Sequence, residues 1–189
     1  MNSIVIVSGL PRSGTSMMMK MLEAGGLEVV TDDIRKADED NPKGYYEFEQ
    51  VKQIKDDQSW LPGCQGKVVK MVSRLLLDLP ENWDYKIIFM RRKLEEILAS
   101  QRKMLERSGK RAPSKEEDAE MAALFERHLD HVDQWMEQQS NADFIHVSYN
   151  KTIRSPQETA EKVTAFLGRD LDVEKMLTVV DTNLYRQRK

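Results

Sequence analysis

A glycine-bordered turn near the N-terminus carries residues suited to binding an anion. Gly9 and Gly14 are separated by four residues, one of which is Arg12. Glycines let a backbone fold closely around a phosphate, and the first turn of a following helix presents unpaired N–H groups and a partial positive charge. Because a short apolar run comes directly before this turn, we interpret residues 9–16 as a strand–loop–helix junction that binds an anionic group. The alternative is a glycine-rich turn that binds nothing.

The same turn differs from the phosphate loop of nucleoside triphosphatases. That pattern places a lysine after the second glycine, where this chain has Thr15. Such enzymes also usually hold Mg²⁺ with an acid at a strand end. Here the later predicted strands lead to Arg74, to Arg91 and Arg92, and to Tyr149. A site that has several cations and no acid to hold a metal suits an anionic donor substrate whose transferred group needs no Mg²⁺. Sulfuryl transfer meets this condition, and a P-loop small-molecule kinase is disfavoured.

A parallel sheet is needed to bring these strand ends together. Strands are predicted at residues 4–7, 67–72, 85–90 and 144–149. Helices are predicted at residues 15–23, about 47–59, 94–107, 115–138 and 156–167. Alternating strands and helices imply right-handed crossovers, and therefore an α/β fold with three α/β/α layers around a central parallel sheet. Ligands of such sheets bind beyond the carboxyl ends of the strands.

Composition excludes several classes of protein. The 189 residues are enough for one domain, which we expect to span 1–189, and the net charge of -3 gives no general attraction to nucleic acid. The apolar runs are too short for a membrane span, and no secretory leader is visible. The single cysteine, Cys64, cannot form an internal disulfide. We therefore expect a cytoplasmic protein.

Three segments, in order along the chain, carry a family resemblance. Residues 9–16, Gly-Leu-Pro-Arg-Ser-Gly-Thr-Ser, resemble the P-[KR]-S-G-T loop that binds the 5′-phosphosulfate in sulfotransferases using 3′-phosphoadenosine 5′-phosphosulfate (PAPS). Residues 87–92, with Ser100 eight residues later, resemble their 3′-phosphate site. Residues 144–168 resemble the family's strand, tyrosine, proline and Phe-Leu-Gly segment. The resemblance is to tyrosylprotein-type and bacterial sulfotransferase-like members, and it implies their P-loop NTPase-like fold.

The resemblance also implies roles for individual residues. Arg12 would stabilise charge on the bridging oxygen as the sulfuryl group leaves. The loop residues that would cradle the 5′-phosphate are Ser13, Gly14, Thr15 and Ser16. Arg92 and Ser100 would bind the 3′-phosphate, and Tyr149 matches a position that contacts the adenine. The alternatives are that Arg92 is a solvated surface residue, that Ser100 is buried and bonded to its own helix, and that Tyr149 is a core residue.

At the position of the general base, this chain differs from the cytosolic members of this family. Those members carry a histidine two residues after a lysine on the second predicted strand. Lys70 matches the lysine, whereas the histidine position holds Val72. The base must then be a carboxylate, or there is none. Asp33 lies where tyrosylprotein-type members place a glutamate, and Glu47 lies in a segment resembling bacterial members. The alternatives are that Asp33 belongs to a solvated acidic loop and that Glu47 lies in the first turn of a helix, where an acidic side chain favours the helix dipole.

The sequence thus predicts a sulfotransferase that moves a sulfuryl group from PAPS to a hydroxyl or amine, without a metal. The product nucleotide would be 3′-phosphoadenosine 5′-phosphate (PAP), and the acceptor a small molecule or a peptide. The alternative is a non-catalytic PAP-binding protein, which the missing histidine favours. No motif indicates the acceptor or the oligomeric state.

Overall fold

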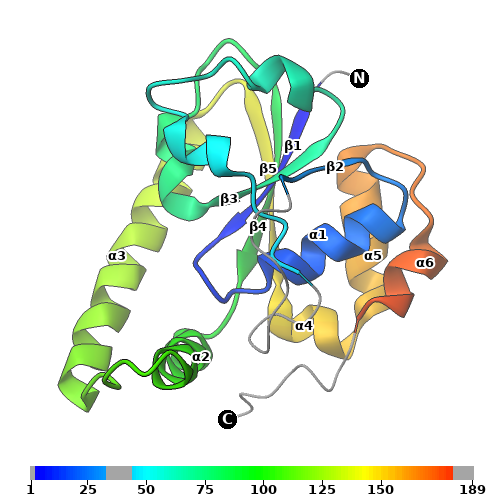
Figure 1. The fold of residues 1–189 in the computed structure, drawn as a ribbon. Coiled ribbons are helices and arrows are strands. Elements are labelled where there is room, and N and C mark those ends of the chain that lie inside the picture. Colours follow the sequence, from blue (N-terminus) through cyan, green and yellow to red (C-terminus); the bar gives the residue numbers. More distant parts are fainter. Residues whose placement is uncertain (1–2, 33–43, 181–189) are drawn as a thin grey trace.

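The fold is built on a five-stranded, entirely parallel sheet (Figure 1). It is seen in a computed structural model, which describes residues 3–32 and 44–180. The strands are β1 (Ile4–Gly9), β2 (Val29–Val30), β3 (Val68–Val72), β4 (Tyr85–Arg91) and β5 (Ala142–Ser148). Their order across the sheet is β2-β3-β1-β4-β5. The carboxyl end of β1 therefore lies between those of β3 and β4.

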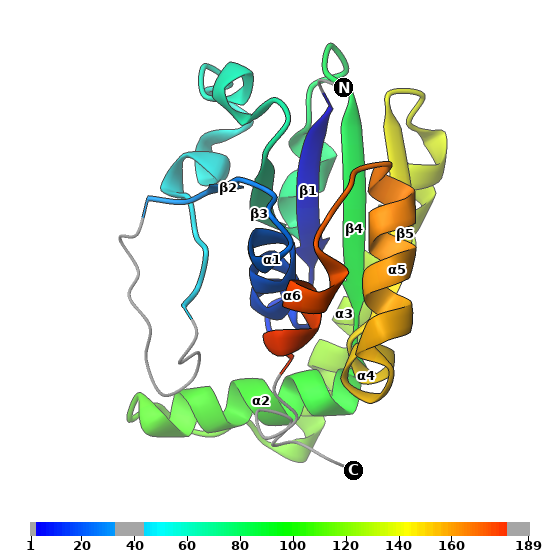
Figure 2. The same cartoon turned by 90° about the vertical axis from the view of Figure 1, so that its right-hand side faces the viewer.

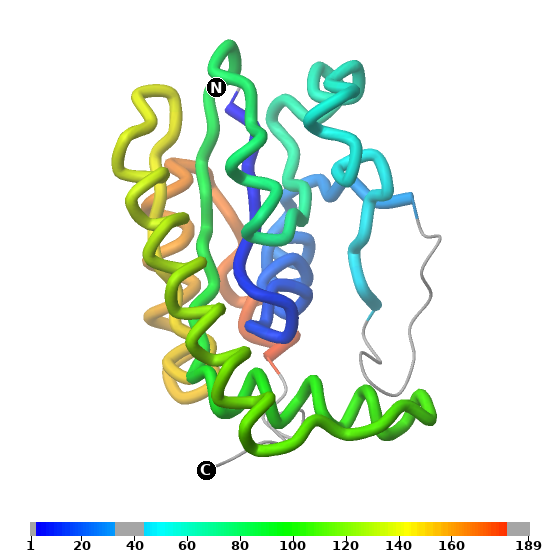
Figure 3. Tube along the Cα trace, turned by 90° about the vertical axis from the view of Figure 1, so that its left-hand side faces the viewer, coloured from blue at the N-terminus to red at the C-terminus, as the bar shows by residue number. Residues whose placement is uncertain are grey.

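Helices cover both faces of this sheet. One face carries α1 (Thr15–Ala24), α4 (Tyr149–Arg154), α5 (Pro156–Leu167) and α6 (Val173–Thr178). The other carries α3 (Lys115–Gln138) and the 3₁₀ helices η1 (Glu49–Gln53), η2 (Leu61–Cys64) and η3 (Ser73–Asp78) (Figure 3). Helix α2 (Leu94–Arg107) runs across the carboxyl-terminal edge of the sheet (Figure 2). In the part of the chain that the structure describes, no helix is long and apolar enough to span a membrane.

The two apolar cores follow from the alternation of side chains along the strands. Val5 and Val7 of β1 pack in the core that includes α1, whereas Ile4 and Ile6 pack in the core that includes α3. All four residues are fully buried. A strand buried on both faces needs an unbroken apolar run, which is what the sequence has there.

The predicted three-layer α/β architecture is confirmed. The helices predicted at 94–107, 115–138 and 156–167 are present with those bounds. Helix α3 begins with a capping box, in which Ser114 Oγ accepts from the N–H of Glu117 at 3.2 Å and Glu117 Oε2 accepts from the N–H of Ser114 at 2.7 Å. These local signals fix where the helix starts.

The helix predicted at about 47–59 is wrong. Only the short η1 forms there, and a turn follows in which Asp57 Oδ1 accepts from the N–H of Ser59 at 2.9 Å. An aspartate that binds the backbone two residues on favours a turn over a helix. Strand β2 was not predicted, and Tyr149, which was predicted to end a strand, begins α4.

Candidate functional site

Residues 9–14, here the glycine loop, begin at the last residue of β1, at the carboxyl-terminal edge of the sheet. Gly9 and Gly14 have φ angles of 149° and 100°, which side-chain-bearing residues rarely adopt. A Cβ on Gly14 would lie 2.4 Å from Tyr149 Cδ2, and one on Gly9 would lie 2.6 Å from Ser13 Oγ. Both glycines are therefore needed for the shape of the loop.

The loop has the donors that an anion requires. Helix α1 begins directly after it, and its N-cap residue, Gly14, has no side chain that could cap the first-turn N–H groups. Ser13 is 1% exposed, and its Oγ has no hydrogen-bond partner among the described residues. A buried hydroxyl without a partner costs about 1–3 kcal/mol. An anionic oxygen in the loop would satisfy it, so the residues present fit a bound phosphate or phosphosulfate.

Arg12 links the glycine loop to α2. Its φ angle is 72°, in the left-handed region that residues other than glycine adopt infrequently. Its Nε donates to Ser100 Oγ at 2.9 Å, and Ser100 is buried in α2. The residue predicted at the 5′-phosphosulfate and the serine predicted at the 3′-phosphate are therefore in direct contact.

Arg92 follows β4 and joins this group of residues. Its Nη1 donates to the carbonyl of Arg12 at 3.1 Å, and its Nε donates to Glu96 Oε2 at 2.9 Å. Its guanidinium carbon lies 4.3 Å from the ring centroid of Tyr149. The second oxygen of Glu96 accepts from Asn150 Nδ2 at 2.8 Å. Two arginines predicted at opposite ends of a nucleotide are thus neighbours at one edge of the sheet.

Two members of this group were missed by sequence reasoning. Glu96 lies four residues after Arg92, but Arg92 precedes the helix predicted at 94–107, so the spacing at which opposite charges meet on a helix was only a weak signal. Asn150 had no comparable signal, because its contact with Glu96 joins α4 to α2. The adenine role predicted for Tyr149 remains a prediction, and the ring lies between Gly14 and Arg92.

A second group of polar residues lies beside the first turn of α1. Lys70 of β3 donates through Nζ to the carbonyl of Tyr45, which also accepts from Ser16 Oγ at 3.3 Å. Glu47 Oε1 lies 4.0 Å from Lys70 Nζ, and the carbonyl of Glu47 accepts from Thr31 Oγ1 at 3.0 Å. The structure thus brings one predicted base, Glu47, to the predicted lysine.

The other predicted base, Asp33, lies outside the described residues. Its neighbour Asp32 accepts from the N–H of Glu49 through Oδ2 at 2.6 Å, so residue 32 lies beside the start of η1. Val72, which occupies the position of the cytosolic histidine, is the last residue of β3 and is 43% exposed. An exposed valine at the edge of the site offers no proton acceptor there.

Among the described histidines, His128 contacts the segment that follows β3. His128 of α3 lies with Nε2 2.8 Å from the buried Ser73 Oγ. Burial lowers the pKa of His128, and the nearby charges of His131 and Arg74 lower it further. Among the described residues, no three His, Cys, Asp or Glu side chains gather in a way that could hold a metal ion.

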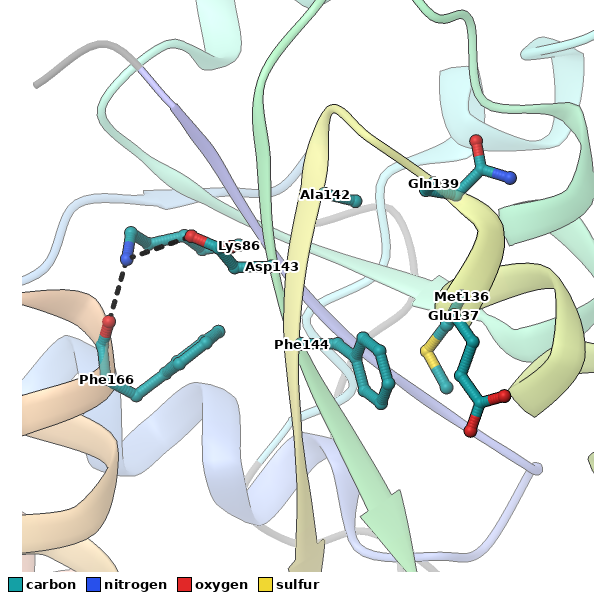
Figure 4. Close-up of a pocket in the computed structure, with 8 residues that line it drawn as sticks. All are labelled: Lys86, Met136, Glu137, Gln139, Ala142, Asp143, Phe144 and Phe166. Carbon is teal, nitrogen blue, oxygen red and sulfur yellow. Dashed lines mark hydrogen bonds and ion pairs between the residues drawn. The ribbon is translucent and has the colours of Figure 1, made fainter.

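A hollow of about 560 Å³ lies at the other end of the sheet (Figure 4). It is lined by the amino-terminal halves of β4 and β5, where Lys86 pairs with Asp143 at 3.7 Å and donates to the carbonyl of Phe166 at 2.8 Å. Because the glycine loop follows the opposite ends of the strands, this hollow is separate from the candidate site.

The family of this chain follows from the match of its sequence to a protein-family model. A model described as the sulfotransferase domain matches residues 2–189. The chain belongs to the sulfotransferase family. The roles predicted for the glycine loop, Arg92 and Ser100 remain predictions. A search among curated proteins gave no match.

Solved sulfotransferase structures share the fold. Sulfotransferase STF1 from Mycobacterium tuberculosis H37Rv has a TM-score of 0.61 at 15% identity, over 97% of this chain and 72% of that one. The sulfotransferase domain of the Synechococcus PCC 7002 olefin synthase has a TM-score of 0.57 at 14% identity, over 98% and 79%. Mouse sulfotransferase SULT7A1, solved in complex with PAP, has a TM-score of 0.51 at 20% identity, over 95% and 62%. At such identities the likeness shows the fold.

Proposed function

We propose that this protein transfers a sulfuryl group from PAPS to the hydroxyl or amine of a small-molecule or peptide acceptor, releasing PAP. The observation that carries the proposal is the chain of contacts from Arg92 through Arg12 to Ser100 at the carboxyl-terminal edge of the sheet. It joins the residues predicted to bind the two phosphate ends of one nucleotide. The PAP complex of the structural neighbour SULT7A1 supports the choice of nucleotide.

The residues divide the binding of the nucleotide between them. PAPS, when bound, supplies a sulfuryl group that is activated by its linkage to the 5′-phosphate. The N–H groups of residues 14–16 and the buried Ser13 Oγ would bind the 5′-phosphate end, and Arg12 would neutralise negative charge there. Arg92 and Ser100 would bind the 3′-phosphate. Tyr149, beside Gly14 and Arg92, would contact the adenine.

A carboxylate would take the proton of the acceptor. Glu47 is one candidate, because its Oε1 lies 4.0 Å from Lys70 Nζ at the end of the sheet that carries the glycine loop. Lys70 would neutralise charge that develops near the reacting oxygen. Asp33 is the alternative base, since it follows Asp32 in the sequence, and the N–H of Asp32 donates to the carbonyl of Glu47 at 3.2 Å.

Thermal unfolding with added nucleotide tests the donor. PAP at 100 times its Kd should stabilise the protein by about 2.7 kcal/mol, which raises the Tm of a chain of this size by roughly 5–11 °C. Arg92→Ala should lose most of this shift, whereas Lys93→Ala, which removes the exposed neighbouring cation, should keep it. Stabilisation by Mg-ATP and none by PAP would favour a kinase and overturn the proposal.

Transfer of labelled sulfate tests the base. Labelled PAPS is incubated with a panel of phenols, alcohols and amines, and the rates of Glu47→Gln and Asp33→Asn are compared with the wild type. Loss of a general base lowers the rate by about 10²–10⁴-fold, so we expect one of the two variants to show that loss. Wild-type rates in both variants would contradict the assignment.

The exposed Val72 at the histidine position favours the second candidate function, non-catalytic binding of PAP. A protein of that kind would be stabilised by PAP and would transfer no label to any acceptor in the panel. The pair of experiments therefore separates an enzyme from a nucleotide-binding relative.

A further inference from the structure

Glu96 is a buried carboxylate inside the candidate nucleotide site. Its side chain is 0% exposed, and that of its partner Arg92 is 8% exposed. A buried carboxylate requires charge partners and hydrogen bonds, because desolvation disfavours an unpaired charge strongly. Both oxygens of Glu96 have such partners, Arg92 Nε at 2.9 Å and Asn150 Nδ2 at 2.8 Å.

These contacts fix the orientation of the Arg92 guanidinium. Glu96 holds it at Nε, the carbonyl of Arg12 holds it at Nη1, and the ring of Tyr149 lies against one face. An arginine binds a phosphate best through parallel N–H donors in a fixed plane. A guanidinium whose plane is set in advance therefore loses less freedom when a phosphate binds.

Glu96 and its partner Asn150 lie at the starts of two helices, which hold them in place beside Arg92. Glu96 lies in the first turn of α2, and its N–H donates to the carbonyl of Lys93 at 3.1 Å, directly after β4. Asn150 lies in the first turn of α4, directly after β5. Glu96 thus ties together the two helices that begin at the carboxyl ends of neighbouring strands, and Arg92 lies between them.

We infer that Glu96 is a positioning residue that orients Arg92 toward the 3′-phosphate and so gives the site its preference for 3′-phosphorylated adenine nucleotides. The inference rests on the proposed function, since it presumes that Arg92 binds that phosphate. It differs from a purely structural role in one respect. A purely structural residue affects the affinity for all adenine nucleotides equally. A residue that positions Arg92 affects only the affinity for nucleotides that carry the 3′-phosphate.

The test compares two nucleotides that differ only in that group. Isothermal titration calorimetry at one ionic strength gives the Kd of PAP and of 5′-AMP for the wild type and for Glu96→Gln. The amide keeps the size of the side chain but removes its charge. Residues that orient metal ligands through hydrogen bonds typically contribute about 10–100-fold in affinity. By analogy, we expect the Kd of PAP to rise by at least about tenfold, and that of 5′-AMP to change by less than about twofold.

The matched control is Glu95→Gln, on the exposed side of the same helical turn, which should leave both Kd values unchanged. Asn150→Ala removes one partner of Glu96 and should lower the ratio of the two affinities to a smaller extent. It also serves as the deciding variant if Glu96→Gln fails to fold. An unchanged ratio in Asn150→Ala would then overturn the inference.

The outcomes separate the inference from the proposed function. A wild type that binds PAP no more tightly than 5′-AMP overturns the proposed function and the inference with it. A wild-type preference for PAP that persists in Glu96→Gln overturns the inference alone. An equal rise of both Kd values in Glu96→Gln also overturns it, because that result indicates general support of the fold.

Discussion

Replacing Gly14 with alanine should destabilise the protein through two separable effects. The first is backbone strain, because an alanine at the φ angle of 100° costs about 1–2 kcal/mol. The second is overlap, because the new Cβ would lie 2.4 Å from Cδ2 of Tyr149. Tyr149 is 6% exposed and its ring lies against Arg92, so the ring cannot move aside freely. Such overpacking costs about 1–3 kcal/mol.

Gly26→Ala is the matched control for this prediction. Its φ angle is 98°, nearly that of Gly14, and no described atom lies within 4 Å of the position of its Cβ. Both variants bear the strain, whereas only Gly14→Ala bears the overlap. The difference of about 2 kcal/mol corresponds to a Tm lower by about 4–8 °C than that of Gly26→Ala. Thermal unfolding followed by circular dichroism measures it.

Two results would refute the reasoning. Equal Tm values for the two alanine variants would show that the ring of Tyr149 does not resist the new methyl group. The second test repeats the Gly14 substitution in a Tyr149→Ala background, where the overlap is gone. In that background, Gly14→Ala should lower the Tm by no more than Gly26→Ala does. A larger decrease would show that the destabilisation arises elsewhere in the glycine loop.

Three further predictions concern stability and reactivity. Ser114→Ala removes the capping box with Glu117 and should cost about 1 kcal/mol, lowering the Tm by about 2–4 °C in a melting experiment. Burial lowers the pKa of His128, so the folded protein prefers the neutral ring, and stability should fall as the pH drops below about 6.5. The decrease in Tm from pH 7.5 to 5.5 should be smaller in His128→Gln, whose amide keeps a contact to Ser73 without titrating. Burial raises the pKa of Cys64 to about 11, so a thiol reagent at pH 8 should label it only after unfolding, and rapid labelling of the native protein would contradict this.

The part of the site that the sequence predicted depends on the topology of parallel sheets. The carboxyl ends of β1, β3 and β4 meet at one edge, so residues that follow them come together whatever the details of packing. Arg12 and Arg92 follow β1 and β4, Lys70 lies two residues before the end of β3, and the structure brings them to this edge. Helix α3 was predictable for a different reason, because the capping box at Ser114 is a local signal.

The missed features depend on contacts between distant segments. The hydrogen bond between Asn150 and Glu96 joins residues 54 positions apart, and it exists only because α4 begins beside α2. No periodicity in the sequence encodes that placement. The helix predicted at about 47–59 does not form, and Val51 and Ile54 are instead buried from a short 3₁₀ turn and the residue that ends it. Burial against the sheet decided the local conformation.

The hydrogen bond from Arg92 to the carbonyl of Arg12 has a consequence for mutational studies of this protein. It ties the left-handed backbone of Arg12 to a side chain assigned to the other end of the nucleotide. Truncating Arg92 would therefore also release the loop that presents Arg12, and the energetic effects of the two substitutions would not add. Only a double-mutant cycle can divide the measured loss between the two arginines.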